Sequence, residues 1–199
     1  MSGTLLFILG PPAAGKMTVG AEIAARTGLR LFHNHLAIEP VLRFFPFGSP
    51  PFGRLVDGFR RSLIEEVAAS DLPGLIFTYV WAFDEPSDER AIEGFAEPFP
   101  RRGGRVHYVE LQASQEERLR RSAGESRLAE KPSRRDLETA RRQLVELDEQ
   151  YQLNSNGRFD GRADYLRIDN THLEPADVAT QVITHFDLPL LNARDQPTP

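Results

Sequence analysis

The feature that most constrains the fold of this chain is a short loop of glycine, proline and alanine that leads into a lysine. Residues 10–18 read Gly-Pro-Pro-Ala-Ala-Gly-Lys-Met-Thr and fit the spacing G-x-x-x-x-G-K. The apolar run 4–9 predicts a buried strand before the loop, and apolar residues at helical spacing over 19–24 predict a helix after it. In this setting the main-chain N–H groups turn inward, and the helix N-terminus and the lysine add positive charge. The loop therefore predicts a site for the phosphates of a nucleotide.

Within the loop, Lys16 is the side chain expected to reach the β and γ phosphates. Only two of the 24 basic residues are lysines, Lys16 and Lys131, so an ammonium stands here in a chain that otherwise uses arginine. Met17 replaces the usual hydroxyl that binds magnesium, and a hydroxyl follows at Thr18. Magnesium is then held by Thr18, or mainly by phosphates and water. The residues expected to contact nucleotide are Gly10, Pro12, Ala13, Ala14, Gly15, Lys16, Met17 and Thr18.

Apolar runs alternate with helical patterns along the whole chain, which predicts an α/β fold. We expect a three-layer sandwich around a central, mostly parallel sheet of five strands, in one domain over residues 1–190. A polar stretch without periodicity at about 122–133 predicts a mobile lid, and residues 191–199 are expected to be a disordered tail. Residues 44–53 are rich in proline and predict a loop. The expected strands are 4–9, 29–32, 75–83, 105–111 and 165–168, and helical patterns cover 19–27, 55–67, 114–122, 137–151 and 175–186, with one more helix from residue 86.

The composition of the chain excludes some kinds of site and opposes some kinds of function. The chain has no cysteine, which excludes disulfides, zinc–thiolate sites and a thiol nucleophile. The longest apolar opening run is too short to span a bilayer, and it lacks the pattern of a signal peptide. The formal net charge of −5 opposes a general role in coating nucleic acid. These features predict a cytoplasmic protein with no membrane association and give no indication of its oligomeric state.

Further candidate residues stand at the ends of the expected strands, where ligands bind in doubly wound sheets. Asp84 follows the expected strand 75–83 and is suited to bind magnesium through water or to take a proton from a substrate, or else to cap the next helix. His33 and His35 follow the second strand and are suited to contact the substrate, although a structural role is as well supported. Four phenylalanines in the proline-rich segment either line an apolar substrate pocket or pack the loop onto the core: Phe44, Phe45, Phe47 and Phe52.

These motifs resemble the P-loop small-molecule kinases, which include adenylate, shikimate and gluconate kinases and chloramphenicol phosphotransferase. The match is specific at residues 10–18, and adenylate kinases similarly keep a threonine at the second position after the lysine. Elsewhere the similarity is architectural, and it includes the closing segment 168–171, Ile-Asp-Asn-Thr. The resemblance implies the P-loop NTPase fold of the nucleoside monophosphate and shikimate kinase type, with ATP and Mg²⁺ as cofactors. It also implies that one or two of the arginines beside the polar stretch act on the phosphates or adenine, unless they form solvated helix faces: Arg118, Arg121 and Arg127.

The leading hypothesis is therefore an enzyme that uses ATP to phosphorylate a small-molecule metabolite or nucleotide. Its expected catalytic residues are Lys16, Asp84, Arg121 and Arg127. Two alternatives remain. One is a nucleotide-binding switch or weak NTPase without a small-molecule acceptor. The other is a kinase acting on a nucleic-acid end, which the arginine-rich stretch 118–142 allows and the acidic balance opposes.

Overall fold

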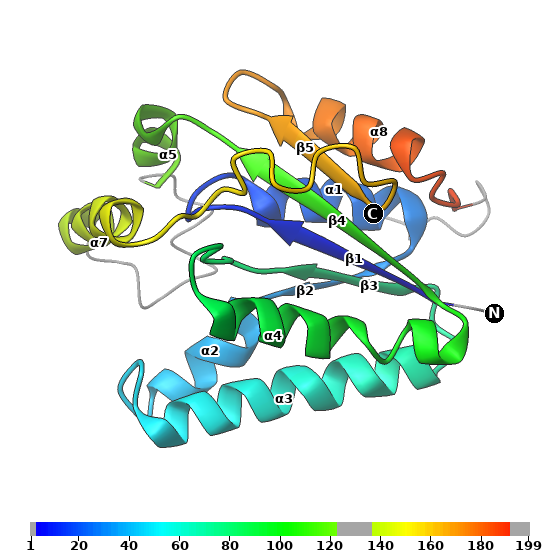
Figure 1. Ribbon diagram of the computed structural model, residues 1–199, viewed down its shortest axis with the longest axis horizontal. Helices are drawn as coiled ribbons and strands as arrows, with labels where there is room; N and C mark the ends of the chain where they lie inside the picture. Colours follow the sequence, from blue (N-terminus) through cyan, green and yellow to red (C-terminus); the bar gives the residue numbers. More distant parts are fainter. Residues whose placement is uncertain (1–2, 123–136, 192–199) are drawn as a thin grey trace.

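The centre of the molecule is a sheet of five parallel strands (Figure 1). The computed structural model describes residues 3–122 and 137–191. The strands lie in the order β2-β3-β1-β4-β5, and every neighbouring pair is parallel, which confirms the predicted sheet. All the carboxyl ends therefore meet at one edge. The strands are β1 (Thr4–Leu9), β2 (Arg30–His33), β3 (Gly74–Thr78), β4 (Arg105–Gln112) and β5 (Tyr165–Asp169).

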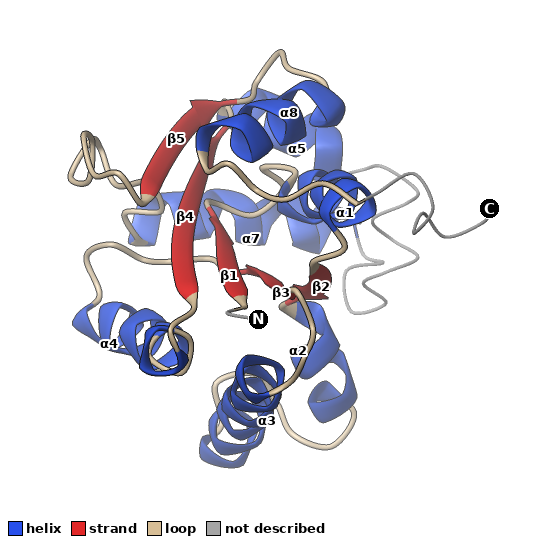
Figure 2. Cartoon of the chain, turned by 90° about the vertical axis from the view of Figure 1, so that its right-hand side faces the viewer, coloured by secondary structure: helices blue, strands red, loops and turns tan. Residues whose placement is uncertain are grey.

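Helices cover both faces of the sheet, so the predicted three-layer sandwich is confirmed (Figures 1 and 2). One layer contains α1 (Lys16–Thr27) and α8 (Pro175–His185), and the other contains α3 (Pro50–Ala69) and α4 (Pro86–Ala96). A separate apolar cluster fills the space on each side of the sheet. The other helices of the described residues are α2 (His35–Leu42), the 3-10 turn η1 (Pro100–Arg102), α5 (Gln115–Ser122) and α7 (Leu137–Gln150).

The expected strand 75–83 is too long, because β3 ends at Thr78. The neighbouring strands β1 and β2 end at the same level, so the residues after Thr78 have almost no strand to pair with. Of the sheet hydrogen bonds that the described residues make beyond Thr78, only the one from the Tyr79 N–H to the Ile8 carbonyl remains, at 3.0 Å. The Trp81 ring stacks on Phe83 with centroids 4.4 Å apart, and both are buried. The second part of the apolar run, after Thr78, therefore reflects aromatic packing rather than a strand.

Two proline-containing segments are more helical than the sequence predicts. α3 begins at Pro50 rather than at residue 55, because prolines in the first turn of a helix lose no hydrogen bond there. The expected loop 44–53 is therefore a loop only up to Ser49. α2 was not predicted, and it contains Pro40 inside its eight residues. Its Ala37 and Ile38 are buried against the sheet, and this packing offsets the proline.

Two predictions fall partly on residues that the structure does not describe. Of the predicted lid at about 122–133, only Ser122 is described, so the lid and Arg127 lie outside the described residues. Of the predicted tail 191–199, only Leu191 is described, and its N–H donates to the Arg26 carbonyl at 2.8 Å. Among residues 3–122 and 137–191, no helix has the length and apolar character needed to cross a bilayer.

Candidate active site

The predicted phosphate loop lies at the carboxyl edge of the sheet, directly after β1. Gly10 has φ 131°, and a Cβ at this position would stand 2.3 Å from the Leu111 carbonyl oxygen of β4. Gly15 has φ 95° and precedes the first residue of α1. A residue with a side chain is strained in both conformations, and at Gly10 it also collides with the neighbouring strand. The two glycines of the motif are therefore fixed by the backbone path and by close packing.

The lysine of the motif lies across the loop. Lys16 Nζ donates to the carbonyls of Gly10 and Pro11, at 2.7 Å each. Lys16 is also the first residue of α1, whose opening N–H groups have no carbonyl partner within the helix. The loop thus combines an ammonium, main-chain donors and the positive end of a helix dipole, which is the chemistry that binds phosphate.

The phosphate loop is held by residues that follow β5 and by residues of α5. Asn170 is buried, and its Nδ2 donates to the Ala14 carbonyl at 2.8 Å. Arg121 Nη1 donates to the same carbonyl at 3.3 Å, and its Nη2 donates to the carbonyls of Asn170 and Thr171. Glu117 accepts from Arg121 Nε at 2.7 Å. Arg121 therefore stands against the phosphate loop, bonded to the carbonyl of Ala14.

Arg118 has a different environment from Arg121. It is buried, and its guanidinium forms a two-pronged ion pair with Asp148 of α7. Its Nε donates to the Ala113 carbonyl, and Nη1 also lies 3.4 Å from the Pro12 carbonyl of the loop. Arg118 thus joins α5, α7 and the phosphate loop, and we interpret it as a positioning residue rather than a direct nucleotide contact.

The phosphate loop opens into a cavity of about 1000 Å³, at the upper end of the range for small-molecule sites. We call the part lined by residues 12–18 and Arg121 the loop half. The distal half is lined by residues of α2, of α3, of the segment 78–88 and of one face of α7. Thr18 lies in the loop half, and its side chain is exposed there.

A buried arginine organises the distal half. Arg60 of α3 donates from Nη1 to Asp57 Oδ1 at 2.8 Å and from Nη2 to Asn34 Oδ1 at 2.6 Å. Its guanidinium carbon lies 5.4 Å from the centroid of the Tyr79 ring. Burial, together with the nearby charges of Asp88 and Asp57, raises the pKa of the Tyr79 phenol to about 12 despite the opposing effect of Arg60. Tyr79 is therefore a neutral hydroxyl group at physiological pH.

Asp84, the predicted aspartate, and Asp88, one turn further along, lie in different environments. Asp84 is exposed and is not among the residues that line the cavity, and its Oδ1 accepts the Gln152 N–H at 2.9 Å. It is displaced because β3 stops at Thr78. Asp88 lines the cavity, and its Oδ2 accepts the Ala82 N–H at 2.9 Å. Burial raises the pKa of Asp88, and the charge of Glu85 adds to this rise.

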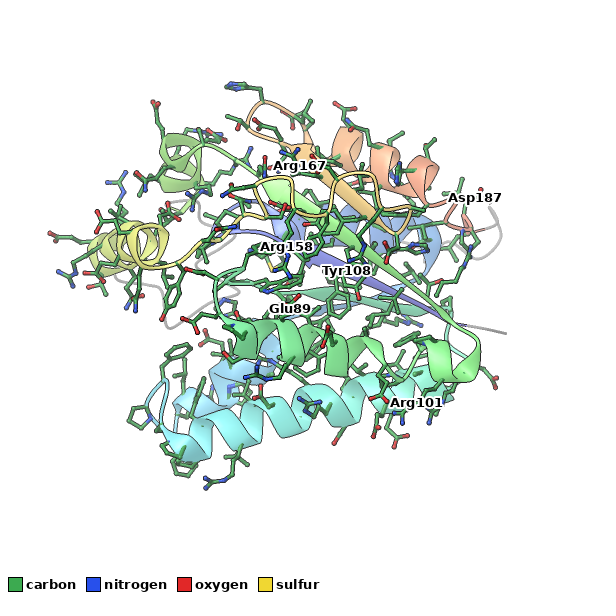
Figure 3. The ribbon with its side chains drawn as sticks, in the orientation of Figure 1. Glu89, Arg101, Tyr108, Arg158, Arg167 and Asp187 are labelled. Atoms are coloured by element: carbon green, nitrogen blue, oxygen red, sulfur yellow. The ribbon has the colours of Figure 1, made fainter. Side chains whose placement is uncertain are left out.

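The segment after α7 holds Asp84 and its neighbours in place. The Phe83 N–H donates to the Gln152 carbonyl at 2.8 Å, and the Gln152 N–H donates to Asp84. The segments around residues 83 and 152 therefore bond to each other in both directions. Further along, Arg158 Nη2 lies 2.7 Å from Glu89 Oε1 of α4, and Figure 3 shows the two side chains together. Asp84 therefore has a structural partner that accounts for its position.

The structure brings both predicted histidines to the cavity, at the end of β2 and the start of α2. His35 Nδ1 lies 3.3 Å from Glu39 Oε1, one turn along α2. Phe47 and Phe52 line the distal half, whereas Phe44 is not among the lining residues and is 78% exposed. Phe47 and Phe52 thus lie at the cavity, while Phe45 and Phe52 also pack with the apolar core.

Sequence reasoning missed Asn34, Asp57, Arg60 and Asp88 in the cavity. Asn34 stands between the two predicted histidines. The spacing of Asp57 and Arg60 by three residues is a signal for an ion pair on one helix face, but it does not show that the pair is buried at a site. The position of Asp88 depends on where β3 ends.

The fold is that of the P-loop small-molecule kinases, as solved structures show. Shikimate kinase from Acinetobacter baumannii in complex with shikimate is 16% identical, with a TM-score of 0.57 over 92% of each chain. The APS kinase of Mycobacterium tuberculosis in complex with AMPPNP and APS is 13% identical, with a TM-score of 0.60 over 94% of this chain and 98% of that one. The tunicamycin resistance protein of Deinococcus radiodurans is 20% identical, with a TM-score of 0.57 over 96% of this chain and 99% of that one. No family model and no curated protein matches the sequence.

Proposed function

We propose that this chain is an ATP-dependent phosphotransferase that phosphorylates a hydroxyl group of a small molecule. The observation that carries the proposal is the single cavity with two chemically different halves. The loop half offers Lys16, Arg121 and main-chain donors to phosphate, and the distal half offers separate room beside it. A nucleotide-binding switch, which has no acceptor molecule to bind, would not need the distal half of the cavity.

The loop half fits the phosphates of ATP. Gly15 has no Cβ, and one built there would approach Asn170 Nδ2 to 3.3 Å. Thr18 carries the hydroxyl that would hold Mg²⁺, together with phosphate oxygens and water, whereas the Met17 thioether is a poor ligand for this hard cation. Bound MgATP would supply the transferred phosphoryl group and neutralise part of its charge.

In the distal half, Asp88 is the group we propose as proton acceptor in place of Asp84. The acceptor oxygen forms a bond to the γ-phosphorus while the bond from that phosphorus to the ADP oxygen breaks. The hydroxyl proton passes to the Asp88 carboxylate, which burial makes more basic than an ordinary aspartate. Lys16 and Arg121 neutralise the charge on the transferred group.

The proposed function is tested by the release of ADP from ATP, measured with and without mixtures of metabolites. We expect a stimulating mixture, and we expect Lys16→Ala to lower the stimulated rate at least about a hundredfold while the fold is retained. The matched control is Lys131→Ala, the other lysine of the chain. Equal rates for Lys16→Ala and the wild type contradict the proposal. Indifference to every metabolite favours a weak NTPase, and stimulation by oligonucleotides favours a nucleic-acid end kinase.

A further inference from the structure

The charge of the distal half suggests which class of acceptor it takes, and this inference rests on the proposed function. The distal half contains four carboxylates: Asp57, Glu85, Asp88 and Glu146. Among its described residues, Arg60 is the single arginine or lysine. Lys16 and Arg121 belong to the loop half, where the phosphates require them. The distal half therefore carries an excess of negative charge.

Arg60 offsets only part of this excess, because it pairs with Asp57 at 2.8 Å and so balances one of the four carboxylates. Its Nη1 and Nη2 bond to Asp57 and Asn34, and the residue is only 7% exposed. Its Nε is buried without a hydrogen-bond partner among the described residues.

Two carboxylates of the distal half, Glu85 and Asp57, act on Asp88. Burial raises the pKa of Asp88, and Glu85 and Asp57 raise it further, while the Ala82 N–H and Arg60 lower it. Tyr79, in the same half, is also affected by the charges of Asp88 and Asp57. On α7, Glu146 is exposed, and its Oε1 lies 3.9 Å from Arg142 Nε. A cation placed among these groups would relieve their repulsion, whereas an anion would add to it.

The other wall of the distal half is apolar. Phe52 and Val56 of α3 and Ile38 of α2 are buried at this wall, and Leu42 and Phe47 complete it. Phe47 packs against Phe52 with ring centroids 5.1 Å apart. A ligand that satisfies both walls has an apolar body on one side and positive charge on the other.

We propose that the acceptor is an amino alcohol: a molecule with a hydroxyl group, a protonated amine and an apolar body. The apolar body packs against α2 and α3, the ammonium lies among Glu85, Asp88 and Glu146, and the hydroxyl faces the loop half. Carboxylate and phosphate compounds are rejected by the same carboxylates.

The test uses matched triplets of alcohols that share one hydroxyl and one apolar body. The members carry an ammonium, an N-acetyl amide or a carboxylate, as in 2-amino-1-phenylethanol, its N-acetyl derivative and 3-hydroxy-3-phenylpropanoate. Aliphatic and larger aromatic triplets extend the panel. Affinity is measured by thermal shift and calorimetry with a non-hydrolysable ATP analogue present, and turnover is measured as ADP release.

We expect the ammonium member of at least one triplet to bind about tenfold or more tightly than its amide partner, and the carboxylate member not to bind. The double variant Glu85→Gln, Glu146→Gln is expected to lose about fivefold in affinity for the ammonium compound and none for the amide. The control is Glu149→Gln, which changes an exposed carboxylate of α7 outside the cavity.

Three results overturn the inference: binding of carboxylate members as tight as that of ammonium members, equal binding of ammonium and amide members throughout, or no ammonium compound that binds. These results leave the proposed function standing if another alcohol stimulates ADP release. Failure of the wild-type chain to bind the ATP analogue contradicts the proposed function instead.

Discussion

At the scale of single residues, the sequence and the structure point to different aspartates: sequence position suggests Asp84, and the structure suggests Asp88. Asp84 follows the longest apolar run, but its carboxylate is engaged by the Gln152 N–H outside the cavity. Asp88 is one turn further along, inside α4, and it lines the cavity. The difference in environment, rather than residue type, decides which of the two can reach a substrate.

We predict that Asp88→Asn lowers kcat about a hundredfold, because an amide cannot take the hydroxyl proton. The conservative variant Asp84→Asn is the matched control, and it should keep the wild-type rate within about threefold. Steady-state kinetics with a stimulating alcohol measure both. A larger loss in Asp84→Asn than in Asp88→Asn would return the catalytic role to Asp84.

The pH dependence of the rate provides a separate prediction for Asp88. Since burial raises its pKa above the ordinary value of 3.8, the ionised base is lost as pH falls through a range above that value. The acid limb of kcat/KM should therefore lie at higher pH than for an ordinary aspartate. The limb should be absent from the residual activity of Asp88→Asn, and an unchanged limb in that variant would exclude Asp88 as its source.

At the scale of elements, the Arg118–Asp148 ion pair connects α5 and α7 on either side of the undescribed residues 123–136. Its Arg118 also approaches the Pro12 carbonyl of the phosphate loop. A two-pronged pair of this kind fixes the orientation of two helices more strongly than a single contact. α7 contributes Glu146 and Leu147 to the distal half, so the pair links the geometry of both halves of the cavity.

We predict that Asp148→Asn destabilises the protein by about 3 kcal/mol or more, because it leaves the buried Arg118 charge without its partner. The free energy of unfolding from urea titration measures this change. Glu149→Gln, at the next and exposed position, is the control and should change stability by less than about 0.5 kcal/mol. A stability loss no larger than that of the control would show that the pair contributes little.

At the scale of the whole molecule, Glu110 of β4 connects the sheet to the segment after α7. Its fully buried carboxylate accepts hydrogen bonds from Gln112, Asn154, the Ser155 N–H and the Tyr165 hydroxyl. Burial alone would raise the pKa of Glu110, but the hydrogen bonds from Ser155, Tyr165 and Gln112 outweigh it and lower the pKa. The ionised form is therefore the one that the folded structure favours.

We predict that this carboxylate makes stability depend on pH. Because its pKa is lower in the folded state, its contribution is present above the ordinary value of 4.5 and is lost as pH falls through the folded pKa. Glu110→Gln should lower the free energy of unfolding by about 2 kcal/mol at pH 7. The free energy of unfolding of this variant should also depend less on pH below pH 7. Urea titrations at pH 7 and in the acid range check both points, and parallel curves for variant and wild type would contradict the assignment.

Most of the fold could be predicted from the sequence, but the distal half of the cavity could not. Residues 10–18 identified the phosphate loop, and the expected β1 matches the structure because a run buried on both faces has a clear pattern. The boundaries that failed are those where packing overrides local preference, at Pro40, Pro50 and the end of β3. There, neighbouring elements decide whether a segment is a helix, a strand or neither.

The sequence alone determined the parts of the site that are continuous along the chain. A loop whose glycines must adopt positive φ carries its signature in nine consecutive residues, because its geometry is local. The distal half joins Arg60, Asp88 and Glu146 from three helices and Asn34 from the turn between β2 and α2. Which of these side chains meet depends on strand order and helix packing, interactions between residues far apart in sequence, so only the tertiary structure decided it.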